Sequence, residues 1–327
     1  MRLTAMLAAV LTLSILALPG CGLLKAVGVM KPPPRNETVT LEVDHVKKFG
    51  DSNTIIVPTL YLYLPVEGSA SASSDSTAIH DIGRGSSGRA SVTIKYKVAG
   101  LDKALAQGIA KAAYDDFVAK LRAAGYKVLT FDDIKGEPMM SGLTRMAKDA
   151  KYDMPLESGE LIATPSDDMA IKKGFGGALL TPYQHFGKST LKEGTIIVPT
   201  FKILAPLSKA ETSSGSASLT LVPGMALTTG GYSLLTHSGG WGNALLRKWV
   251  FGLSDNVGTV VKTEDTTPAV ANALTKVFSV LGAAGTMRKS ANYTLTIDKD
   301  AYRTGALKGL SSMNDEAAKI IASVKKS

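Results

Sequence analysis

Alternation of apolar and polar residues predicts β-strands along much of the chain. We expect strands at 54–64, 90–98, 126–131 and 293–297, which are rich in β-branched and aromatic residues. The segment 90–98 shows the clearest alternation, since one face carries only apolar residues: Val92, Ile94, Tyr96 and Val98. Such a strand has one face on a core and the other in solvent.

Three helices are expected between and after these strands. The first should run from its cap at Asp102 to about Ala124, because apolar residues recur at every fourth position: Leu105, Ile109, Ala113, Phe117 and Leu121. Gly125 should end it. A second helix is predicted from Thr267 to about Ala284, with Pro268 in its first turn, and a third over 312–324. The mixture of strands and helices predicts an α/β or α+β fold.

A hexapeptide, Thr-Ile-Ile-Val-Pro-Thr, occurs at 54–59 and again at 195–200. A Ser-rich stretch follows each copy, and we expect both stretches, 66–89 and 208–218, to be loops. A predicted strand, a helix that ends in Ala-Ala-Gly and a further strand then follow in both parts of the chain.

This repeated order predicts two similar sheet-plus-helix halves, 37–155 and 156–327. An internal duplication would place the two hexapeptides in equivalent strands of two separate sheets. The alternative is one domain that contains two similar strands, because β-branched runs with a proline at an edge recur readily.

The first residues have the features of a secretory signal. Arg2 precedes an apolar run from Leu3 to Leu18, which is interrupted by polar residues and is shorter than the ~20 residues that span a bilayer. The run ends in Leu18-Pro19-Gly20-Cys21, which resembles the lipobox of bacterial lipoproteins. Residues 1–20 are therefore expected to be a lipoprotein signal peptide. The alternative is an ordinary signal peptide followed by an incidental thiol.

The resemblance implies cleavage before Cys21 and attachment of fatty acyl chains, including palmitate, to its thiol and new amino group. It also implies an outer-membrane location facing the periplasm, because Gly22 is not Asp. Residues 21–36 would then be a lipidated tether that membrane lipid holds, stiffened by Pro32, Pro33 and Pro34.

Composition adds constraints on partners and cofactors. The 327 residues include 37 Lys plus Arg against 28 Asp plus Glu, a formal charge of +9. This charge suits anionic envelope partners such as lipid head groups, lipopolysaccharide or peptidoglycan. Nucleic acid is not an expected partner of an exported protein. The single cysteine excludes a disulfide framework and any cysteine-rich metal site.

Two glycine-containing motifs lack the context that phosphate binding requires. Gly83–Gly88 fits G-x-G-x-x-G, but a dinucleotide site needs a strand before the motif and a helix after it. Here a Ser-rich stretch precedes and the predicted strand 90–98 follows. Gly187–Thr190 imitates the end of a phosphate-binding loop, but Pro182 stands where the first glycine is required. The first motif is interpreted as a flexible loop, and the second is rejected as a phosphate-binding loop.

Two further motifs resemble those of penicillin-recognising serine enzymes: Ser189–Lys192 and Ser254–Asn256. The third motif of that family appears only as Lys262-Thr263-Glu264, with Glu where a small residue is needed. Gly194 and the β-branched run also end any helix that would hold the nucleophile. We therefore expect no catalytic residues.

No metal site or cofactor is expected either. The four histidines are widely separated and lack a nearby second ligand: His45, His80, His185 and His237. Three pairs of adjacent aspartates, at 115–116, 132–133 and 167–168, are interpreted as solvated because neighbouring side chains point apart.

A looser resemblance concerns architecture. The lipobox, a Val-Pro strand, a helix ending in Ala-Ala-Gly and a following strand together look like envelope lipoproteins related to the curli-export lipoprotein and the TolB N-terminal domain. The expected function is that of a non-catalytic scaffold or partner-binding lipoprotein, whose partner is an envelope protein or peptidoglycan. The alternatives are an oligomeric export-channel lipoprotein and a periplasmic serine hydrolase. Arg84 and Arg89, in the first Ser-rich stretch, are the candidate partner-binding residues.

Overall fold

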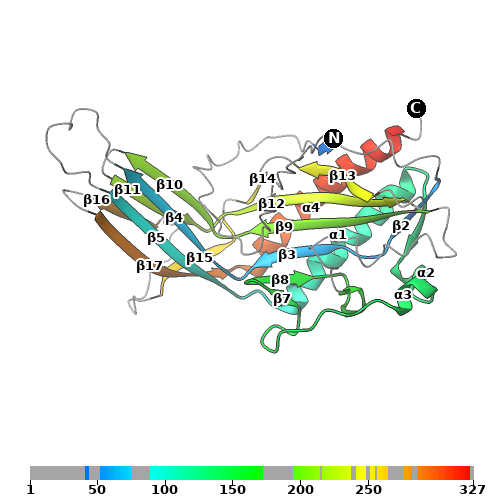
Figure 1. Cartoon of the computed structure of the whole chain (residues 1–327), viewed down its shortest axis with the longest axis horizontal. Helices are drawn as coiled ribbons and strands as arrows, with labels where there is room; N and C mark the ends of the chain where they lie inside the picture. Colours follow the sequence, from blue (N-terminus) through cyan, green and yellow to red (C-terminus); the bar gives the residue numbers. More distant parts are fainter. Residues whose placement is uncertain are drawn as a thin grey trace, which may run out of the picture.

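The fold is mixed, with three β-sheets and two long helices. The structure is a computed structural model, and it describes residues 41–43, 52–75, 89–171, 194–213, 216–236, 241–247, 251–254, 256–263, 276–281 and 286–324. Figure 1 shows a large sheet with both long helices toward one end and two smaller sheets toward the other. This arrangement confirms the α+β prediction.

The large sheet contains ten strands. They are β1 (Leu41–Val43), β2 (Thr54–Val57), β3 (Tyr61–Pro65), β6 (Lys127–Thr130), β7 (Leu156–Glu157), β8 (Glu160–Ala163), β9 (Gly194–Leu204), β12 (Met225–Thr236), β13 (Trp241–Arg247) and β14 (Phe251–Ser254). Its main order is β1-β13-β12-β9-β3-β8-β7, while β2 pairs with β6 and β9, and β14 pairs with β12.

Two smaller sheets lie beyond the large one. The four-stranded sheet has the order β15 (Gly258–Lys262), β17 (Thr286–Ile297), β5 (Arg89–Ala99) and β4 (Glu67–Asp75). The three-stranded sheet has the order β10 (Leu207–Ser213), β11 (Ser216–Val222) and β16 (Lys276–Leu281). Their apolar side chains are buried in one core: Ala72, Val92, Ile94, Ala217, Leu219 and Leu221.

The prediction that the Ser-rich stretches are loops is wrong where the structure describes them, whereas residues 76–88 and 214–215 lie outside the described residues. Residues 67–75 form β4, and residues of the second stretch form β10 and β11. In β4, serines alternate with alanines from Ser69 to Ser73, so Ser69, Ser71 and Ser73 face solvent while Ala72 is buried. Small residues that alternate in this way pair as a strand once a partner such as β5 is present, although they carry little hydrophobic signal of their own.

The first predicted helix is confirmed as α1 (Lys103–Ala123). The backbone N–H of Leu105 donates to Oδ1 of Asp102 at 2.9 Å, and the predicted apolar stripe is buried. Gly125 follows the helix with a φ of +87°, which glycine adopts without strain. Two short helices, α2 (Phe131–Ile134) and α3 (Pro138–Ser141), come after β6.

The predicted helix from Thr267 to Ala284 is wrong where the structure describes it. Residues 276–281 form β16, which pairs antiparallel with β11, and β17 follows. The second long helix is α4 (Lys299–Val324), which begins well before the predicted residue 312. No helix in the described ranges combines the length and the apolar composition needed to cross a bilayer.

Two glycines, Gly305 and Gly309, explain why the sequence does not predict the first part of α4 as a helix. A Cβ on Gly305 would lie 2.7 Å from Cε of Met225, and one on Gly309 would lie 2.0 Å from Cδ2 of Leu253. Glycine lowers helix propensity. At these two positions it allows β12 and β14 to approach the helix closely.

The two hexapeptides lie side by side in the large sheet. Strand β2 pairs parallel with β9, with Thr54 opposite Gly194 and Ile55 opposite Thr195. The prediction that each copy belongs to its own sheet is therefore wrong, and duplication is not shown. Strands from both predicted halves also pair in the four-stranded sheet, where β5 runs parallel to β17. Both the large sheet and the four-stranded sheet therefore contain strands from each side of the predicted boundary at residue 155.

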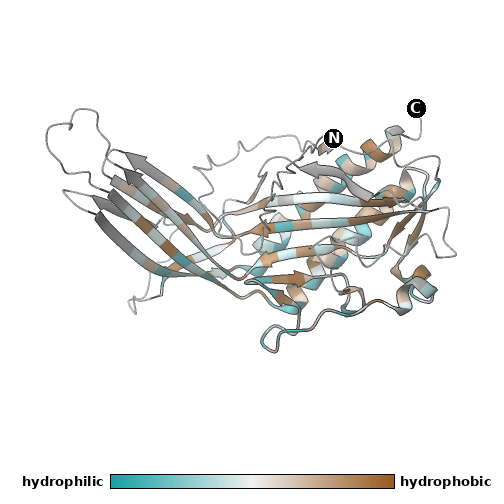
Figure 2. Ribbon diagram, in the orientation of Figure 1, coloured by the Kyte–Doolittle hydropathy of each residue, from teal (hydrophilic) through white to brown (hydrophobic). Residues whose placement is uncertain are grey.

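The large sheet is buried on both faces. Helices α1 and α4 pack on one face, where Phe117 and Tyr232 lie with ring centroids 5.0 Å apart. The other face has its own apolar cluster, which includes Ile56, Tyr61 and Ile134. Figure 2 shows hydrophobic and hydrophilic residues alternating along the strands of the four-stranded sheet, so that sheet keeps a polar face.

Candidate functional site

The polar face of the four-stranded sheet forms a cavity of about 640 Å³. It is lined by Glu67, Gly68, Ser69, Lys95, Tyr96, Lys97, Ser158, Thr263, Asn292 and Tyr293. Most of these residues lie on neighbouring positions of β4, β5 and β17. Ser158 comes instead from the turn between β7 and β8, so the large sheet supplies one wall.

A second cavity, of about 460 Å³, adjoins the first and shares Glu67 and Lys97 with it. It extends along the end of β5, past the turn at Gly100, to the start of α1. Lys151 and Tyr152 line its other side. We refer to the two cavities together as the sheet groove.

Two lysines dominate the charge of the sheet groove. Lys95 and Lys97 are exposed, and neither has an ionic partner in the described part of the chain. They lie two residues apart on one face of β5, which separates their Cα atoms by about 6.6 Å. Their ammonium groups are thus available to an anionic ligand.

Polar residues flank both lysines. Ser69 and Asn292 lie opposite Lys95 on the two neighbouring strands, and Glu67 and Thr294 lie opposite Lys97 in the same way. Hydroxyl and amide groups can each donate or accept a hydrogen bond. The groove therefore presents cations, neutral hydrogen-bonding groups and the carboxylates of Glu67 and Asp102.

The buried face of β5 determines the direction in which Lys95 and Lys97 point. Tyr96 points into the core, and burial raises the pKa of its hydroxyl to about 12, with the charge of Glu160 adding to the effect. The ring lies over Gly68 on the adjacent strand, where a Cβ would be 2.5 Å from Oη of Tyr96. Because Tyr96 is held in this way, the residues on either side of it, Lys95 and Lys97, are directed outward.

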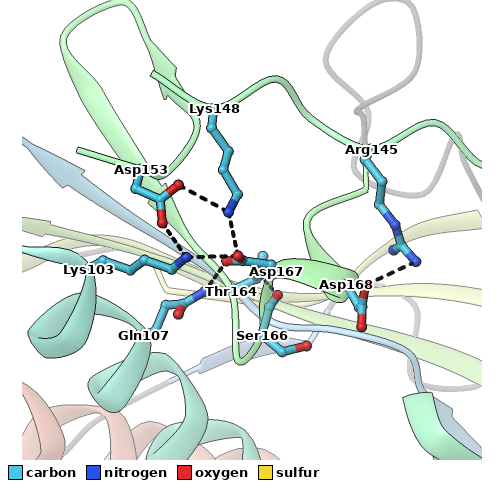
Figure 3. A network of polar contacts seen from close by, with 9 residues as sticks. All are labelled: Lys103, Gln107, Arg145, Lys148, Asp153, Thr164, Ser166, Asp167 and Asp168. Carbon is cyan, nitrogen blue, oxygen red and sulfur yellow. Dashed lines mark hydrogen bonds and ion pairs between the residues drawn. The ribbon is translucent and has the colours of Figure 1, made fainter. Parts of the chain in front are cut away.

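A cluster of ion pairs lies beside the second cavity (Figure 3). Nζ of Lys103 on α1 lies 2.6 Å from Oδ2 of Asp153 and 2.8 Å from Oδ2 of Asp167. Nζ of Lys148 lies 3.2 Å from Oδ1 of Asp153 and 2.5 Å from Oδ2 of Asp167. Nε2 of Gln107 donates to Oδ1 of Asp167 at 2.8 Å. We call these five residues the Asp167 cluster.

The cluster fixes the charges of its members. Burial alone would raise the pKa of Asp167, but hydrogen bonds from Lys103, Lys148 and Gln107 outweigh it and lower the pKa to about 2. Hydrogen bonds to Asp153 and Asp167 in turn raise the pKa of Lys103. At neutral pH both carboxylates are ionised, and all four of their oxygens accept hydrogen bonds from neighbouring side chains.

Such a cluster suits a structural role better than a catalytic one. A general acid or base needs a pKa near the working pH, whereas hydrogen bonds lower the pKa of Asp153 and Asp167 and raise that of Lys103. The contacts connect α1 to the segment 148–167, which includes the Lys151 and Tyr152 wall of the sheet groove. The Asp167 cluster therefore holds that wall against α1.

Asp167→Asn is expected to lower the free energy of unfolding by about 1 kcal/mol near pH 7. The expected loss is smaller than the pKa shift of Asp167 alone would give, because its side chain is 41% exposed and solvent screens its ion pairs. The folded-state pKa is depressed from 3.8, so this stabilisation is present above about pH 4 and disappears as the pH falls toward about 2. Denaturant unfolding at several pH values measures the difference.

Asp168→Asn is the matched control. Its carboxylate is 79% exposed and lies 3.9 Å from Arg145, so removing its charge should change stability by less than about 0.5 kcal/mol. Equal losses in the two variants, or a loss in Asp167→Asn that persists at about pH 2, would contradict the role assigned to Asp167.

Only one of the candidate residues predicted from the sequence, Arg89, is among the described residues, and it does not line the groove. Cys21, Arg84 and the four histidines lie outside the described residues. Arg89 begins β5, and its backbone pairs with Asp75 and Thr286. Among the described residues, no group of three or more histidine, cysteine, aspartate or glutamate side chains could hold a metal ion.

Sequence reasoning missed the lysines of the groove and the role of Asp167. The alternation in 90–98 did place Lys95 and Lys97 on the polar face, and that signal could have indicated them. Nothing in the sequence pairs Asp167 with Lys103, which is 64 residues away. Comparisons with known proteins found no matching family model, no matching curated protein and no matching solved structure.

Proposed function

We propose that this chain is a lipid-anchored protein of the outer membrane that faces the periplasm and binds a partner without catalysing a reaction. The lipobox-like Leu18-Pro19-Gly20-Cys21 supports the anchor. Two or more acyl chains hold a protein stably on a membrane, whereas one chain alone is marginal.

The sheet groove is the observation that carries the binding function. It is open, and two of its lysines, Lys95 and Lys97, have no ionic partners in the described part of the chain. Its described lining residues offer charge and hydrogen-bonding groups. Recognition of a partner uses these features.

The alternatives receive less support from the geometry. In an export channel, the apolar faces of β4 and β5 would be needed for contacts outside the chain, but Ala72, Val92 and Ile94 are buried in its own core. For a serine hydrolase, the resemblance makes Ser189 the nucleophile, and that residue lies outside the described residues. Ser254, from the second motif, lies in a local turn, where its hydroxyl donates to the carbonyl oxygen of Asn256 at 3.0 Å and accepts from that residue's N–H.

Cross-linking in native envelopes, followed by mass spectrometry of the adducts, tests the proposal. We expect the chain in the outer-membrane fraction, cross-linked to a defined envelope component. The mass of the detergent-extracted protein separates the alternatives, since a monomer or dimer agrees with a partner-binding role. A ring of many copies would favour the export channel, and recovery from the soluble fraction without adducts would contradict the proposal.

A further inference from the structure

We propose that the sheet groove binds the carboxylate-bearing glycan of the cell wall, peptidoglycan. This inference rests on the proposed function only for its location, because a periplasmic protein on the outer membrane meets this polymer. The ligand class itself follows from the chemistry of the groove, its charge and its shape.

The hydrogen-bonding groups of the groove suit a sugar. A sugar hydroxyl both donates and accepts, so its binding site needs groups of both kinds. Ser69, Ser158 and Thr263 supply hydroxyls, and Asn292 supplies an amide. Glu67 adds a carboxylate that can only accept. A glycan hydroxyl can donate to Glu67, whereas a ligand made only of anionic groups would be repelled there.

The charge of the groove requires acidic groups on that glycan. Lys95 and Lys97 have no ionic partners among the described residues, and the matching positions on β17 are the neutral Asn292 and Thr294. Carboxylates of the ligand would complete these two pairs. Glu67 lies opposite Lys97 in register without forming an ion pair, so it leaves the ammonium group accessible.

The shape of the groove suits a polymer. The two cavities share Glu67 and Lys97 and continue from the sheet face to the start of α1. A small ligand is normally enclosed on most of its surface, in a mainly apolar pocket. Here the two cavities follow one another along the sheet and carry charged and polar side chains at several positions, which gives a chain room to pass along both.

The test is sedimentation of the full-length protein in detergent with purified peptidoglycan sacculi. We expect the protein to bind, and the double variant Lys95→Gln, Lys97→Gln to bind about fivefold to tenfold more weakly, as loss of two exposed charge contacts predicts. Added salt should reduce the binding of the unaltered protein. The matched control, Lys308→Gln, Lys319→Gln, removes two exposed lysines of α4 that also lack ionic partners in the described chain. It should bind sacculi normally.

Three outcomes would overturn the inference: equal weakening in both double variants, equal binding to sacculi whose carboxylates have been amidated, or equal binding to polyglutamate, which carries carboxylates without sugar. Circular dichroism and thermal unfolding check that both variants fold. If sacculi fail to retain the chain while native-envelope cross-linking yields a protein partner, this inference fails and the proposed function stands. If the chain binds sacculi but carries no lipid, the inference stands and the proposed anchor fails.

Discussion

Cys21→Ser is expected to leave the chain as an uncleaved precursor. The lipobox resemblance implies a peptidase that acts only after the thiol of Cys21 is acylated, and serine cannot take that lipid. The chain has no other cysteine that could substitute. Immunoblots should therefore show only the longer form, and labelled palmitate should not be incorporated. This effect is all-or-none and is the largest that we predict.

Gly22→Asp provides the control for this experiment. The thiol remains, so the chain should still be acylated and cleaved, but the resemblance implies retention in the inner membrane when Asp follows the cysteine. Density-gradient fractionation separates the two membranes. Normal processing of Cys21→Ser would refute the lipoprotein assignment. An unchanged location of Gly22→Asp would refute only the sorting argument.

Asn314→Ala should cause the largest loss of stability among the substitutions considered. Asn314 is fully buried and joins three elements: its Oδ1 accepts from the Tyr232 hydroxyl of β12 at 2.8 Å, and its Nδ2 donates to the Ala113 carbonyl oxygen and to Asp116 Oδ2 of α1. Alanine removes these hydrogen bonds and leaves the Tyr232 hydroxyl without its acceptor in the core.

We expect the free energy of unfolding to fall by about 3 kcal/mol, because a buried polar group without a hydrogen-bond partner destabilises the fold by its full desolvation free energy. In a chain of this size the midpoint of thermal unfolding should fall by roughly 5 °C. Lys319→Ala, on an exposed position of the same helix, should change stability by less than about 0.5 kcal/mol. Similar losses of stability in both variants would show that α4 is sensitive to any substitution. They would contradict the role assigned to the buried hydrogen bonds of Asn314.

The elements that the sequence predicted well are those whose own residues determine them. Helix α1 has a cap at Asp102, an apolar stripe and a glycine at its end, and the structure shows all three. Strand β5 alternates so regularly that its buried and exposed faces were evident. Local propensity and tertiary packing favour the same structure in both elements.

The elements that the sequence predicted poorly depend on partners distant along the chain. The alanines and serines of β4 form a strand because β5 pairs with them, and α4 contains Gly305 and Gly309 because neighbouring strands approach it there. The repeated hexapeptide indicated two strands but could not reveal that they would be neighbours in one sheet. Pairing of this kind is a property of the assembled fold.

The candidate site also combines residues that the sequence indicates with residues that only the fold brings together. The polar face of β5 was visible in the sequence, and with it Lys95 and Lys97. Their neighbours Ser69 and Asn292 come from strands that only the sheet order brings together. The Asp167 cluster likewise needs α1 and the segment 148–167 to be adjacent, which no spacing in the sequence reveals.

The mass of the N-terminal peptide of the protein, purified from membranes, tests the lipid anchor most directly. The account predicts a peptide that begins at Cys21 and is heavier than its residues by two or more fatty acyl chains. An N-terminal peptide that begins elsewhere, or one that begins at Cys21 without acyl groups, would contradict it.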